Sequence, residues 1–177
     1  MKSYSRRIKL VLFHRDESGR PTAYLVRRPK SNDGQGTKKW PGVVLATLGC
    51  KPKDGEDDLA ALVRLLNETS KGRLGVLGAL TLLELLTEDG PDGNILHVGE
   101  SATIYGLTVS PEIIRLIYPE LSDDAFVRVT AKDLHLLTNA NDANRFDPPA
   151  DDKIIVFSHL RSALETALRG RPRQTTL

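Results

Sequence analysis

The order in which the apolar segments occur constrains the fold of this chain more than any other feature. The sequence predicts strands over 8–14 and 22–26, which turn residues join as an antiparallel hairpin. An apolar stretch over 43–48 follows, then a helix over 57–70, further strands, and a C-terminal helix over 153–168. A doubly wound fold needs regular strand–helix alternation, which this order lacks. We therefore expect an α/β fold of the mixed α+β kind, built on a mixed or largely antiparallel sheet.

The central helix is predicted from the spacing of its leucines and valine. Apolar residues at positions i, i+3, i+4 and i+7 form one buried stripe on a helix. Acidic residues over 56–58 complement the helix dipole at its start, and Gly72 is a suitable stop. The predicted stripe consists of Leu59, Leu62, Val63 and Leu66.

In the second half of the chain, the predicted helices, strands and turns are short. The segment 80–86 is ambiguous, and its length favours a strand. The remaining expectations are a turn at 88–93, a strand over 102–109, a short helix over 111–118, a strand over 126–129, a helical turn over 131–137 and a polar loop over 139–152. The length of 177 residues suits a single domain, 1–177, that ends in a short basic tail over 169–177.

Composition excludes several classes of protein. The formal charge is only +2, so no global field favours nucleic acid or a membrane surface as a partner. No apolar stretch reaches the roughly 20 residues of a membrane helix. Cys50 is the only cysteine, which rules out an intrachain disulfide and a four-cysteine zinc site. We expect a cytoplasmic protein, and its oligomeric state is open.

One motif carries chemical information. Gly55-Glu56 is followed by seven residues, 57–63, and then by Arg64 and Glu68. With the preceding Trp40-Pro41-Gly42, this segment resembles the Nudix superfamily, and its wider pattern is similar to the type I isopentenyl-diphosphate isomerase branch. The resemblance implies a Nudix-like fold, with a mixed sheet, a central Nudix helix and a C-terminal helix.

The resemblance also shows what this chain lacks. Nudix hydrolases hold divalent cations on three glutamates of the helix, and those positions here are Leu65, Glu68 and Thr69. Lys71 replaces the last glycine of the box. In the isomerase branch, the catalytic cysteine aligns with Gly49 and a metal-binding histidine with Lys51. The box is therefore degenerate, and its residual candidate catalytic residues are Glu56, Arg64 and Glu68, of which Glu56 and Arg64 also have a structural role in holding the loop.

We therefore expect a non-hydrolytic Nudix-like protein that binds a phosphorylated small molecule or a protein partner, without a cofactor. The candidate ligand-binding residues are Arg28, Lys38, Lys39, Trp40 and Lys51, and the alternative for these basic residues is a solvated surface. The alternative function is a hydrolase of nucleoside diphosphate derivatives, dependent on Mg²⁺ or Mn²⁺. Its metal ligands would be Glu68 and Glu56, with Asp58 or Glu100 as further ligands.

Two other features leave alternatives open. Cys50, beside Lys51, is either a reactive thiol with a lowered pKa or a buried inert cysteine, which is the commoner case. The four histidines, His14, His97, His135 and His159, show no metal-ligand spacing, so each is interpreted as structural or as a surface residue.

Overall fold

The computed structural model describes residues 6–27, 42–84, 86, 93–119, 125–140 and 153–169. Among these residues, seven strands form the main sheet, and two form a small second sheet. The strands of the main sheet are β1 (Arg7–Arg15), β2 (Pro21–Arg27), β3 (Val44–Leu45), β4 (Leu48–Cys50), β5 (Gly93–Val98), β6 (Ala102–Thr108) and β7 (Phe126–Val129). The second sheet pairs β8 (Leu137–Asn139) with β9 (Ile154–Val156) in parallel.

Strand β1 lies at the centre of the main sheet. It pairs antiparallel with β2 and with β4, and parallel with β6. Strand β5 extends the sheet beyond β6, while β3 and β7 both pair with β2. The sheet is therefore mixed, and the expected hairpin of β1 and β2 is confirmed.

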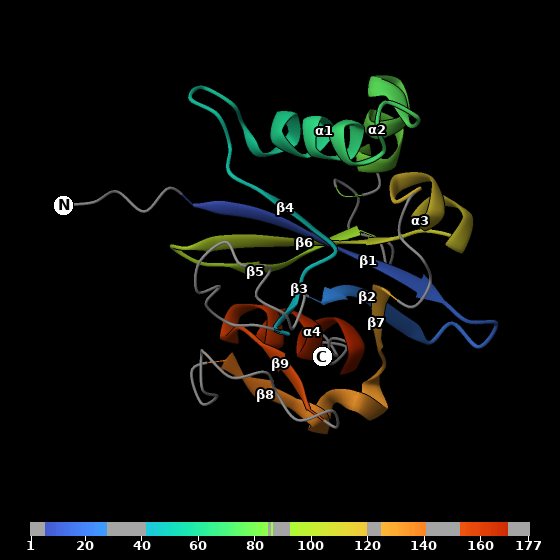
Figure 1. Cartoon of the computed structure of the whole chain (residues 1–177), viewed down its shortest axis with the longest axis vertical. Coiled ribbons are helices and arrows are strands. Elements are labelled where there is room, and N and C mark those ends of the chain that lie inside the picture. The colour runs from blue at the N-terminus through green and yellow to red at the C-terminus, as the bar shows by residue number, and fades with distance from the viewer. Residues whose placement is uncertain are drawn as a thin grey trace, which may run out of the picture.

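Helices cover both faces of the sheet (Figure 1). On one face lie α1 (Asp58–Thr69), α2 (Gly75–Glu84) and α3 (Pro111–Ile117), and on the other lies α4 (Ser158–Arg169). Side chains of β1 alternate between the two cores, because successive residues of a strand point to opposite faces. Ile8, Leu10 and Leu12 pack with α1, α2 and α3, whereas Val11 and Phe13 pack with α4.

Helix α1 begins and ends as the sequence indicates. The carboxylate of Asp57 accepts a hydrogen bond from the backbone N–H of Ala60 and caps the helix. Gly72, with φ of +75°, donates its N–H to the carbonyl of Asn67 beyond the helix end.

The buried face of α1 differs from the predicted stripe. Leu62 and Leu66 are fully buried, but Leu59 is 45% exposed and Leu65 is only 8% exposed. The helix is rotated so that Ala61 and Leu65 face the sheet. The predicted stripe is therefore wrong at Leu59, and Ala61 and Leu65 complete the buried face.

Three other element predictions need correction. The segment 80–86, predicted as a strand, lies mainly in α2, which begins earlier at Gly75. The single stretch over 43–48 is divided into β3 and the start of β4, with Thr47 between them. The helix predicted over 153–168 is strand β9 followed by α4, so Ile155 belongs to a strand and Leu160, Leu164 and Leu168 to the helix.

The other predictions agree with the structure where it describes the chain. Strand β6, helix α3, strand β7 and a 3-10 helix at Ala131–Leu136 occupy their predicted segments. The turn at 88–92, most of the loop over 139–152 and the tail after Arg169 lie outside the described residues. No helix within the described ranges has the length and apolar character needed to cross a membrane.

Candidate functional site

The loop between β4 and α1 is shaped by a tight turn. The N–H of Glu56 donates to the carbonyl of Lys53 at 3.0 Å, which closes a turn over residues 53–56. Gly55 occupies this turn with φ of +79°, a conformation that residues with a Cβ rarely adopt. The turn returns the chain toward α1 and directs the carboxylate of Glu56 at the helix.

Glu56 and Arg64 form the best-defined polar contact of this region. Arg64 donates from Nε to Oε1 of Glu56 at 2.8 Å and from Nη2 to Oε2 at 2.7 Å. The backbone N–H of Lys53 donates to the same carboxylate, and Arg64 also donates to the carbonyl of Lys51. The guanidinium therefore fastens the loop to α1, which is the structural role expected of both residues.

These contacts fix the charge of the pair. The hydrogen bonds from the Arg64 side chain, followed by that from the Lys53 backbone, lower the pKa of Glu56 to about 2. The same bonds raise the pKa of Arg64. At neutral pH the pair is an ionised carboxylate and a guanidinium, and the carboxylate already accepts three hydrogen bonds.

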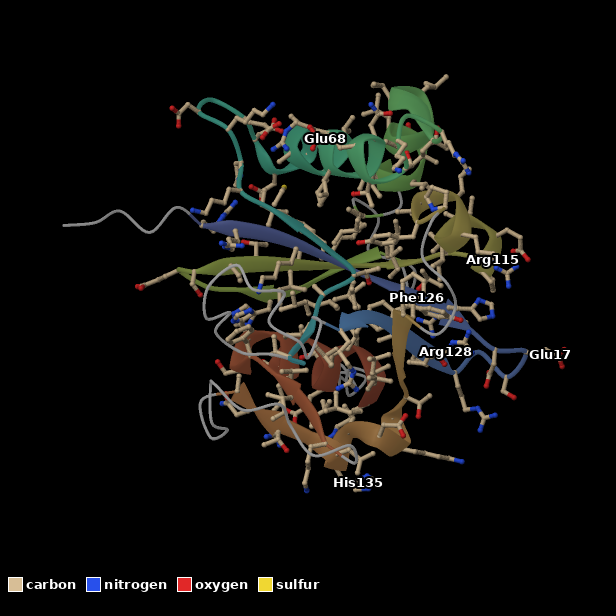
Figure 2. All side chains as sticks on the ribbon, in the orientation of Figure 1. Glu17, Glu68, Arg115, Phe126, Arg128 and His135 are labelled. Carbon is tan, nitrogen blue, oxygen red and sulfur yellow. The ribbon has the colours of Figure 1, made fainter. Side chains whose placement is uncertain are left out.

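Of the three metal positions that the resemblance implies, Leu65 and Thr69 offer no carboxylate. The side chain of Leu65 is buried in the core between α1 and the sheet. The hydroxyl of Thr69 donates to the carbonyl of Leu65 at 2.7 Å, back into its own helix. Glu68 lies on α1 in the helical layer above the sheet in Figure 2, with its side chain 60% exposed and Oε2 3.5 Å from Nη1 of Arg64.

Mg²⁺ prefers a tight octahedron of oxygen ligands, usually with one or two carboxylates. Of the two glutamates retained here, Glu68 is exposed, whereas Glu56 is held by Arg64. No group of three or more His, Cys, Asp or Glu side chains suited to a metal ion occurs among the described residues. The described part of the box therefore retains one of the three helix carboxylates that the resemblance implies for a divalent ion, and Leu65 and Thr69 do not replace the other two.

Asp58 and Glu100 do not complete the box either. Asp58 forms an ion pair with Arg6, and its other oxygen accepts a hydrogen bond from the Tyr105 hydroxyl at 2.6 Å. Burial, followed by this hydrogen bond, raises the pKa of Tyr105 to about 12. Glu100 is exposed in the turn between β5 and β6.

Gly49 and Cys50 lie on opposite faces of β4. Gly49 pairs with Lys9 and Cys50 with Ile8, so the thiol faces the α1 side of the sheet. Burial raises the pKa of Cys50 above its usual range, although Arg64 acts in the opposite direction. The structure thus supports the interpretation of Cys50 as a largely inert thiol.

Of the predicted ligand-binding residues, Lys51 is described, and its side chain is exposed at the start of the loop. Arg28, Lys38, Lys39 and Trp40 lie outside the described residues.

Sequence reasoning did not predict a basic cluster on the other face of the sheet. Lys9 of β1 contacts His159 of α4, and the rings of His97 and His159 lie 6.3 Å apart. Lys9 and His159 are 150 positions apart in the chain. The available sequence signal was the alternation of β1, which places Lys9 on the face opposite Ile8 and Leu10.

No protein-family model and no curated protein matches this chain.

Proposed function

We propose that this protein is a Nudix-like, non-hydrolytic protein that binds a phosphorylated small molecule. The proposal combines two features of one segment. Gly55, Glu56 and Arg64 retain the turn and the ion pair that hold the box loop to its helix. Leu65 and Thr69 replace the carboxylates that hydrolysis needs.

The observation that carries the proposal is the direction of Leu65. Its side chain packs into the apolar core with Leu62 and Leu66 instead of facing the loop. A position integrated into the core cannot present an oxygen ligand without disturbing the packing of α1 against the sheet. The packing of α1 against the sheet therefore accounts for the absence of a metal ligand at position 65.

The fold is compatible with the resemblance. A mixed sheet lies between the box helix on one face and α4 on the other (Figure 1). Lys51, exposed at the start of the box loop, supplies positive charge for a phosphate group. Phosphate recognition by lysine needs no metal ion, so binding is able to persist where hydrolysis is lost.

The test is a hydrolysis assay of ADP-ribose, nucleoside diphosphate derivatives and prenyl diphosphates with Mg²⁺ or Mn²⁺, in parallel with a thermal-shift screen of the same compounds. A ligand that binds the folded state raises the melting temperature by mass action. We expect a shift from at least one phosphorylated compound and no turnover of any. Turnover that is lost in Glu68→Gln would instead establish the alternative, a metal-dependent hydrolase with a rearranged site.

A further inference from the structure

Four neighbouring strands place a row of residues on the face of the sheet that α4 covers. In register across the strands, Gly49 of β4 pairs with Lys9 of β1, Lys9 with Ile104 of β6, and Ile104 with His97 of β5. Residues opposite one another in a ladder project on the same face. Ile104 packs in the core beneath α4, so Lys9 and His97 flank the edge of that core.

The start of α4 brings two aromatic rings over this row. His159 contacts Lys9 through Nε2, and its ring is stacked on Phe157 at 5.8 Å with an interplanar angle of 6°. Nζ of Lys9 lies 5.9 Å from the centre of the Phe157 ring. The stacked pair fixes the imidazole of His159 beside the lysine, and Lys9, His97 and His159 all remain partly exposed.

The neighbouring charges that shift the pKa values of Lys9 and His159 come from basic residues. Burial, followed by the charge of Arg7, lowers the pKa of Lys9 to about 8. Burial, followed by Lys9 and His97, lowers the pKa of His159 to about 4. The charged neighbours that lower these two pKa values, Arg7, Lys9 and His97, are all basic residues.

At neutral pH the imidazole of His159 is unprotonated, so its Nε2 accepts from the ammonium of Lys9. A lysine ammonium has three N–H donors, and this contact uses one of them. The remaining N–H donor of neutral His159 is then at Nδ1, and the imidazole of His97 lies beside this ring at a centroid distance of 6.3 Å. The cluster thus holds donors and positive charge for which an anion is the natural complement.

We propose that Lys9, His97 and His159 form an anion-binding site that takes the phosphate group of a small phosphorylated ligand. A phosphate monoester carries close to two negative charges near neutral pH and three acceptor oxygens, which match an ammonium and two imidazoles better than a carboxylate does. The inference rests on the proposed function and names the residues that recognise its ligand. It places the phosphate on the face of the sheet that α4 covers.

The experiment is a titration of the full chain with inorganic pyrophosphate and inorganic phosphate, followed by NMR of the histidine ring protons. Binding at this site shifts the His97 and His159 resonances and raises the pKa of His159, because a bound anion stabilises the imidazolium. The variants are Lys9→Met, Lys51→Met and, as a control that removes an exposed lysine elsewhere, Lys132→Met. Methionine keeps the approximate length of the lysine side chain and removes its charge.

We expect Lys9→Met to weaken pyrophosphate binding by about tenfold or more, the scale of one charge-assisted hydrogen bond, with Lys132→Met nearly unchanged. Loss of binding in Lys51→Met with Lys9→Met unaffected would overturn this site but leave the proposed function intact. Histidine signals that stay unmoved by either probe would also overturn it. The hydrolysis assay tests the proposed function separately, since turnover would reject that function whatever the histidines do.

Discussion

Arg64 donates two parallel hydrogen bonds to the carboxylate of Glu56, although the two residues stand eight positions apart and on different elements. Bidentate pairs of this kind give geometric specificity as well as energy. The pair explains why the loop over 53–56 and helix α1 keep their relative position although Leu65 and Thr69 offer no carboxylate.

The first prediction concerns the pH dependence of this pair. The pKa of Glu56 is lowered from 4.5 to about 2 in the folded protein. Its contribution to stability is therefore complete above about pH 4.5 and is lost as the pH falls toward 2. We expect Glu56→Gln to be less stable than the wild type at pH 7, and the difference to shrink at pH 3.

Urea unfolding of both proteins at the two pH values measures this difference. Glu17→Gln, at the exposed turn between β1 and β2, serves as the control for loss of a carboxylate. A difference that stays constant between the two pH values would show that the ion pair does not stabilise the fold.

The second prediction compares two leucines on one helix. Leu65→Ala removes a side chain that is 8% exposed and leaves a cavity, so we expect a loss of about 2–5 kcal/mol of unfolding free energy. Leu59→Ala, at a side chain that is 45% exposed, should cost much less. Equal losses in chemical denaturation would mean that α1 is rotated differently, and that Leu65 is available to the box loop.

The third prediction concerns Thr47, which is 2% exposed at the junction of β3 and β4. Its hydroxyl accepts from the N–H of Leu12 at 2.8 Å and donates to the carbonyl of Tyr24. Thr47→Val keeps the shape but leaves both backbone groups without this partner, at a cost of about 1–3 kcal/mol. Thr81→Val, whose exposed hydroxyl donates within α2, should be nearly neutral. Comparable effects of the two substitutions on thermal unfolding would contradict this role.

The fourth prediction concerns His159 without any ligand. Burial is the first cause of its lowered pKa, and the charge of Lys9 is the second. Lys9→Met should therefore raise the pKa of His159 above about 4 but leave it below its ordinary 6.5. Wild-type stability should also fall as the pH drops from about 6.5 toward 4, because the unfolded chain binds this proton more readily.

An NMR titration of the His159 ring follows both effects, with Lys132→Met as the control. A pKa of His159 that is the same in Lys9→Met and in the wild type would show that the two side chains do not interact in solution.

The elements that the sequence predicted well are those with clear periodicity. Strand β1 and helix α1 have alternating or helical patterns and definite turn or cap residues. Helix α2 was mistaken for a strand because its sequence is apolar at most positions, so it lacks a helical period, and Val76 and Leu77 are exposed despite their character. Strand β9 was assigned to a helix because Ile155 falls at a spacing that suits the stripe of α4.

The two candidate sites also differ in how far the sequence could predict them. Glu56 and Arg64 are close in sequence, so a motif spacing was enough to pair them. Lys9, His97 and His159 come together only through the register of three strands and the docking of α4 on the sheet. Local patterns do not contain that information, which is why the histidines were interpreted one at a time.

The most direct test is an NMR titration with Mn²⁺, whose paramagnetism broadens the amide signals near a bound ion. With Leu65 in the core and Glu56 held by Arg64, we predict no broadening centred on α1 at millimolar Mn²⁺, and the same spectrum for Glu68→Gln. Broadening that is confined to the residues around Glu56 and Glu68, and is abolished in Glu68→Gln, would contradict the account of a box that no longer holds metal.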